Sequence, residues 1–67
     1  MTTIQVNGEK RTYEEPLTIT ELLDKLGVPS ATVLVECNRM VLARDQFDSK
    51  RVDEGDVLEL VRFVGGG

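Results

Sequence analysis

Hydrophobic and polar positions alternate along the first residues of the chain, and the alternation stops at Asn7-Gly8. Ile4 and Val6 share one face of an extended segment, and the largely polar stretch 9–13 follows the turn. Asn-Gly between two extended segments is a strong hairpin signal, because a type I′ turn needs positive φ at both central positions. The pattern therefore predicts a hairpin whose polar second strand lies at a sheet edge.

The apolar residues then change to a helical spacing. One stripe at this spacing consists of Ile19, Leu22, Leu23 and Leu26. Thr18 is a suitable N-cap, and Glu21 three residues later completes a capping box. Gly27 suits the left-handed position after the last turn, and Pro29 prevents continuation. We expect one short helix that begins after Thr18 and ends before Gly27.

Strand-like segments return in the second half of the chain. Residues 32–37 are rich in β-branched side chains, 40–42 follow an apparent turn, and 57–63 are the most apolar segment. Residues 43–47 are expected to form a single helical turn. A hairpin, a crossover helix and a returning strand predict an α+β fold of the β-grasp kind. We expect a mixed sheet of four to five strands with the helix on one face and the last strand beside the first.

Size and composition exclude several classes of function. The 67 residues suffice for one small domain with little room for a deep pocket, so an enzyme with its own substrate cavity is disfavoured. A net charge of −4 disfavours nucleic-acid binding and favours a partner with a basic face. There is no histidine, no metal-ligand spacing and no membrane-length apolar run. The acidic stretches 14–15 and 53–56 are interpreted as solvated loops, and we expect a cytoplasmic protein without a bound metal.

The single cysteine, Cys37, cannot form an internal disulfide. It alternates with Val33 and Val35, which favours a small core residue over a reactive thiol.

Alternation along the last strand separates two sets of side chains. Leu58 and Leu60 should face the helix. The opposite face then carries Val57, Glu59, Val61 and Phe63. Three exposed apolar side chains on a small acidic domain predict a docking patch. The alternative is that the strand bulges and Phe63 joins the core.

The chain stops on three glycines directly after this apolar strand. We expect residues 1–64 to form the domain and residues 65–67 a flexible tail. Three extended residues span roughly 10 Å, and glycine has no Cβ to obstruct a narrow crevice. Such an arm would carry the terminal carboxylate into a recessed site on another protein. An ordinary chain end without a function is the alternative.

Several local motifs occur in one order along the whole chain. They are Asn7-Gly8, Leu22-Leu23, Asn38-Arg39-Met40-Val41, Arg44-Asp45-Gln46-Phe47, Gly55-Asp56-Val57-Leu58-Glu59 and Val64-Gly65-Gly66-Gly67. This ordered set resembles the ubiquitin-like sulfur carriers, and within them the ThiS group, which serves thiazole formation in thiamin biosynthesis.

The resemblance implies a chemistry for the tail. The carboxylate of Gly67 would be adenylated by a ubiquitin-activating-type (ThiF-like) adenylyltransferase that uses ATP. It would then become a thiocarboxylate that donates sulfur to a ThiG-like thiazole synthase. Gly65 and Gly66 would thread the end into the partner's site. The chain itself would be a monomeric protein substrate without a bound cofactor, and not an enzyme.

Partner contacts are expected from Val57, Val61, Phe63, Val64 and Arg44. Arg44 has a second interpretation, in which it only holds the nearby loop. Three other functions use the same features: a molybdopterin-type sulfur carrier, a modifier joined to lysines by isopeptide bonds, and a non-covalent β-grasp module with inert glycines.

Overall fold

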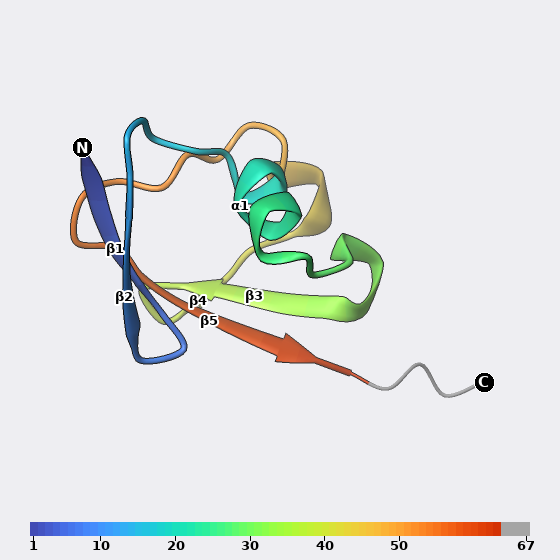
Figure 1. Ribbon diagram of the computed structural model, residues 1–67. Coiled ribbons are helices and arrows are strands. Elements are labelled where there is room, and N and C mark those ends of the chain that lie inside the picture. Colours follow the sequence, from blue (N-terminus) through green and yellow to red (C-terminus); the bar gives the residue numbers. More distant parts are fainter. Residues whose placement is uncertain (64–67) are drawn as a thin grey trace.

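A five-stranded mixed sheet with one helix on one face forms the body of the protein in a computed structural model (Figure 1). The elements in chain order are β1 (Thr2–Val6), β2 (Glu9–Tyr13), α1 (Ile19–Leu26), η1 (Ser30–Thr32), β3 (Val33–Cys37), β4 (Met40–Val41), η2 (Arg44–Gln46) and β5 (Val57–Arg62). The structure describes residues 1–63. The expected boundary between domain and tail, after Val64, lies outside the described residues.

The strand order is β2-β1-β5-β3-β4, so β5 occupies the centre of the sheet. β5 runs parallel to β1 and antiparallel to β3, and the two ends of the order are antiparallel hairpin strands. The β-grasp arrangement and the central position of the last strand are therefore confirmed. The most apolar segment lies where both of its edges are hydrogen-bonded and α1 covers one face (Figure 1).

The hairpin turn and the two helix ends that the sequence marks most strongly have the expected backbone. Asn7 and Gly8 have φ of 49° and 85°, the positive values that a type I′ hairpin requires. Thr18 caps α1: its hydroxyl accepts a hydrogen bond from the Glu21 N–H at 3.1 Å, and a Glu21 carboxylate oxygen accepts one from the Thr18 N–H at 2.9 Å. Gly27 ends the helix in the left-handed conformation. The local chemistry at these positions decides where the elements begin and end.

The core lies between α1 and the covered face of the sheet. Its buried apolar residues are Ile4, Val6, Leu17, Ile19, Leu22, Leu23, Val33, Val35, Cys37, Phe47, Val52 and Leu58. Cys37 is a free thiol inside this cluster, and burial raises its pKa. The interpretation of Cys37 as a core residue is confirmed, because a buried thiol with a raised pKa has little of the reactive thiolate form.

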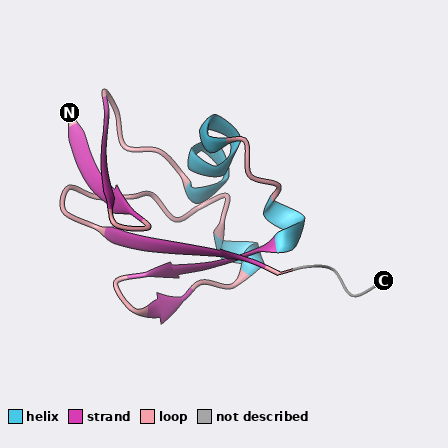
Figure 2. Cartoon of the chain, turned by 60° about the horizontal axis from the view of Figure 1, so that its bottom comes forward, coloured by secondary structure: helices cyan, strands magenta, loops and turns pink. Residues whose placement is uncertain are grey.

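Two features of the connections are absent from the sequence prediction. The helix–strand connection contains a short 3-10 helix, η1, and Thr18 forms an isolated antiparallel bridge with Arg51. Figure 2 shows the 3-10 helices as short cyan turns separate from α1. The long segment before β5 is held by Val52, whose N–H donates to the Leu17 carbonyl at 2.8 Å.

Within residues 1–63, no helix has the length and apolar character needed to cross a bilayer.

Candidate functional site

The face of the sheet opposite α1 carries a group of exposed apolar side chains. We define the outer-face patch as Leu34, Val41, Val57, Val61 and Phe63, which are 38% to 60% exposed. The predicted division of β5 is confirmed: Leu58 is fully buried, Leu60 packs partly against the core, and Val57 and Val61 are on the other face. Phe63 remains 47% exposed and outside the core cluster, so the alternative in which it joins the core is wrong.

Leu34 and Val41 are members of the patch that the sequence interpretation missed. Leu34 lies opposite Val61 in the β3–β5 register, and Val41 lies opposite Glu36 in the β3–β4 register. Opposite residues in antiparallel strands project to the same face, so these side chains extend the patch across three strands. The alternation of Leu34 with buried Val33 and Val35 was the signal that could have found it.

Two asparagines in hairpin turns hold β5 in place. The Asn7 side chain accepts from the Leu60 N–H at 2.7 Å and donates to the Leu60 carbonyl at 3.3 Å. Asn38 Oδ1 accepts from the Val57 N–H at 3.0 Å, and its Nδ2 donates to Asp56 Oδ1 at 3.0 Å. Both turns therefore bind the backbone of the strand that leads into the glycine end, in addition to the sheet ladder. These contacts fix the position from which the chain continues.

The structure brings together two of the residues that were expected to contact a partner. The Arg44 guanidinium lies over the ring of Phe63, with its central carbon 5.9 Å from the ring centroid. The same group donates a hydrogen bond to the Ala31 carbonyl. The Phe63 N–H donates to the Thr32 carbonyl at 3.1 Å. Arg44 thus connects the segment before β3 to the last described residue, and its expected contact with a partner stays a prediction.

The remaining expected site residues are Val64, Gly65, Gly66 and Gly67, and they lie outside the described residues. The structure describes the strand that precedes them. β5 is central in the sheet and hydrogen-bonded on both edges, and it exposes the apolar side chains of Val57 and Val61.

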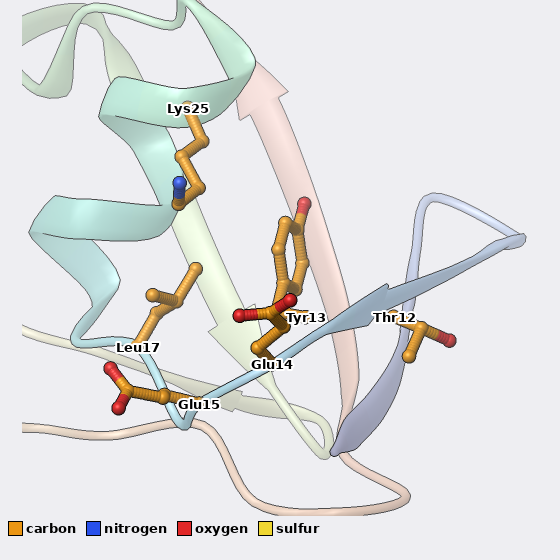
Figure 3. Close-up of a pocket in the computed structure, with 6 residues that line it drawn as sticks. All are labelled: Thr12, Tyr13, Glu14, Glu15, Leu17 and Lys25. Atoms are coloured by element: carbon orange, nitrogen blue, oxygen red, sulfur yellow. The ribbon is translucent and has the colours of Figure 1, made fainter.

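A second hollow on the body lies between the end of β2 and α1. It encloses about 360 Å³ and is lined by Thr12, Tyr13, Glu14, Glu15, Leu17 and Lys25. Figure 3 shows the Leu17 side chain and the Lys25 amine on its α1 side, with the Glu14 carboxylate close to Tyr13. Over residues 1–63, no group of three or more histidine, cysteine, aspartate or glutamate side chains could hold a metal ion. The lining residues offer no cysteine, serine or histidine as nucleophile or base.

Comparison with known proteins connects this body and its end to one family. The ThiS family model matches residues 4–67. The sulfur carrier protein ThiS of Bacillus subtilis is 31% identical over 96% of this chain and 98% of its own length. A thiazole synthase of Paramagnetospirillum magneticum is 40% identical over 92% of this chain, which spans only 19% of that relative's length.

A solved structure agrees with the sequence matches. The crystal structure of the thiamine biosynthesis protein ThiS from Geobacter metallireducens superposes with a TM-score of 0.85 at 42% identity, covering 98% of this chain and all of that one. The likeness therefore extends over the whole body and is far above the level of shared fold alone. The chain belongs to the ThiS family.

Proposed function

We propose that the chain is a sulfur carrier of thiamin biosynthesis, and that the carboxylate of Gly67 is the atom group that carries the sulfur. The observation that supports this most directly is the family match, which continues through the three glycines to residue 67. The body then serves to present this end. β5 is the central strand and is hydrogen-bonded on both edges, which suits that task. A strand held in this way limits how far the residues that follow it can reach.

The proposed chemistry begins with activation of a poor electrophile. A carboxylate oxygen of Gly67 attacks the α-phosphate of ATP, pyrophosphate leaves, and an acyl-adenylate forms in the site of a ubiquitin-activating-type adenylyltransferase. A sulfide equivalent then replaces AMP at the acyl carbon and gives a thiocarboxylate. Gly65 and Gly66 give this end a narrow profile, since they add no Cβ to the thread. The acid, base and metal groups for these steps belong to the partner.

The sulfur acceptor in this proposal is a thiazole synthase. The relative from Paramagnetospirillum magneticum carries that name and contains a segment 40% identical to this chain within a much longer polypeptide. The relative from Magnetococcus marinus has the same name and a similar segment, 38% identical over 20% of its length. These matches support a carrier segment joined to a thiazole synthase within those two relatives.

The outer-face patch is the proposed contact with these enzymes, through Val57, Val61 and Phe63 in particular. These three side chains are 42% to 48% exposed and lie on β5 or directly after it, on the segment that leads to the glycine end. A partner that covers this face would therefore hold the body at a fixed distance from the reacting carboxylate. Val64 follows Phe63 in the sequence, and we include it in the proposed contact.

Intact-mass measurement tests the proposed function. The chain is incubated with the adenylyltransferase of its own organism, ATP and a sulfur donor, with reactions lacking ATP as the control. Exchange of one terminal oxygen for sulfur supports the carrier. Lysine-linked conjugates of higher mass would indicate a modifier, and an unchanged mass in the complete reaction would contradict the proposal. A carrier that is loaded but supplies no sulfur to thiazole synthase would favour the molybdopterin-type alternative.

A further inference from the structure

Two carboxylates lie directly opposite each other in the middle of the outer face. Glu36 of β3 and Glu59 of β5 are partners in the antiparallel register. Side chains at such a pair of positions project to the same face, with Cβ atoms about 4.5–5.5 Å apart. Both residues line one open hollow of about 460 Å³ together with Val57, Asn38 and Arg39.

Apolar members of the outer-face patch surround this pair. The next pair on this face is Leu34 and Val61, and Val41 lies across from Glu36 on β4. Val57 lies two residues before Glu59 on the same face of β5. Glu36 is itself partly buried by this setting. The pair is therefore an acidic centre within an apolar frame, which differs from a solvated loop of acidic residues.

The free protein places two negative charges in this hollow against a single positive one. Arg39 is the one cationic residue among those that line the hollow. Like charges directly opposite in a sheet are destabilising. The chain thus holds an unfavourable pair on a surface that one added cation could make favourable.

We propose that Glu36 and Glu59 together accept one arginine or lysine side chain of thiazole synthase, while the apolar frame packs against that partner's surface. This inference rests on the proposed function and adds the partner's chemistry at the contact. A planar guanidinium has the donors to bridge two carboxylates at once, so arginine fits best.

Three observations favour thiazole synthase as the occupant. Two relatives of this chain that carry the name thiazole synthase contain a similar segment within a longer polypeptide. In those proteins the segment is therefore tethered to the rest of the polypeptide. The acidic centre also lies on β5, the strand that continues into the glycine end, so docking here holds that end close to the acceptor. The net charge of −4 favours approach to a basic face.

Glutamine variants test the pair, since they keep the shape of the side chain and remove its charge. Glu36→Gln, Glu59→Gln and the double variant are compared with wild type for binding to purified thiazole synthase by calorimetry at low and high salt. Glu9→Gln is the matched control, because Glu9 is an exposed glutamate on the edge strand β2, away from this face.

Each single variant should bind about tenfold more weakly, a smaller loss than for a buried charge left fully unpaired, because the remaining carboxylate still pairs with the partner's cation. The double variant should lose more than the two single losses combined, because the cation that both carboxylates share is then left unpaired in the contact, and its binding should depend less on salt. Either single variant should also melt at a higher temperature than wild type when free, because the repulsion is gone. Glu9→Gln should bind like wild type.

Variants at 36 and 59 that bind as tightly as wild type would overturn the inference. So would a loss confined to the adenylation step, since that would assign the face to the other enzyme. Thiocarboxylate formation by wild type is measured alongside: a wild-type chain that is loaded but not bound by thiazole synthase contradicts the inference and leaves the carrier chemistry intact. A wild-type chain that is never loaded contradicts the proposed function itself.

Discussion

Arg44 is the residue for which two interpretations make opposite predictions. If it acts through its own chain, Arg44→Ala removes the hydrogen bond to the Ala31 carbonyl and the contact over the Phe63 ring. If it acts mainly on a partner, the same change leaves the free protein as stable as before. The contacts favour the first outcome, so we expect the variant to unfold at a lower denaturant concentration.

The magnitude follows from the two contacts. A side-chain hydrogen bond contributes a net of about 0.5–1.5 kcal/mol. A cation over an aromatic ring at an exposed site contributes about 0.5–1 kcal/mol, and the 5.9 Å separation places this pair near the limit of such contacts. Arg44→Ala should therefore cost about 1–2 kcal/mol. For a domain of this size that is a drop in melting temperature of about 4–16 °C.

Urea unfolding of a double-mutant cycle isolates the ring contact. Arg44→Ala, Phe63→Leu and the pair should show a coupling of about 0.5 kcal/mol, the share assigned to the cation and the ring. Arg11→Ala is the matched control, because Arg11 is exposed on β2 and its side chain makes no hydrogen bond within residues 1–63. An Arg44→Ala protein as stable as wild type, with zero coupling and slower thiocarboxylate formation, would refute the intramolecular role and support the partner contact.

Three further predictions concern the tail and the helix cap. Gly66→Val should block thiocarboxylate formation in the intact-mass assay and leave the urea midpoint unchanged. Thiocarboxylate formation at the wild-type rate would contradict the claim that the glycine end must enter a narrow crevice of the partner. Thr18→Ala should cost about 1 kcal/mol in urea unfolding, because one N-cap hydrogen bond is lost, and an unchanged midpoint would contradict that role. The Thr18 N–H holds the pKa of the Glu21 carboxyl below its ordinary value of 4.5. The charged form therefore stabilises the fold above that pH, and its contribution is lost as pH falls through the lower folded-state pKa. Glu21→Gln should lose less stability than wild type on acidification from about pH 6 to pH 3, and parallel curves would show that Glu21 is not responsible.

The parts of the fold that local chemistry controls could be predicted from the sequence. The Asn7-Gly8 turn and the Thr18 and Gly27 caps each satisfy backbone groups within a few residues, so their signal is contained in a short window. The two faces of β5 also followed from alternation alone, because its period of two leaves only one way to bury Leu58.

Contacts between distant segments could not be predicted in the same way. The pairing of Glu36 with Glu59 depends on the register of β3 and β5, which the Asn38 turn and its bonds to β5 help to fix. The approach of Arg44 to Phe63 depends on how η2 sits beside the end of β5. Alternation says which face a residue occupies, but it does not say which residue lies opposite.

The most direct test of the account removes the end of the chain and measures sulfur delivery. A version lacking Gly66 and Gly67 is compared with the full chain in a reconstituted reaction that forms the thiazole product, with circular dichroism to verify that both versions are folded. We expect the truncated protein to be folded and to yield no thiazole. A truncated protein that supports thiazole formation at the full rate would contradict the claim that the body exists to present its terminal carboxylate for activation.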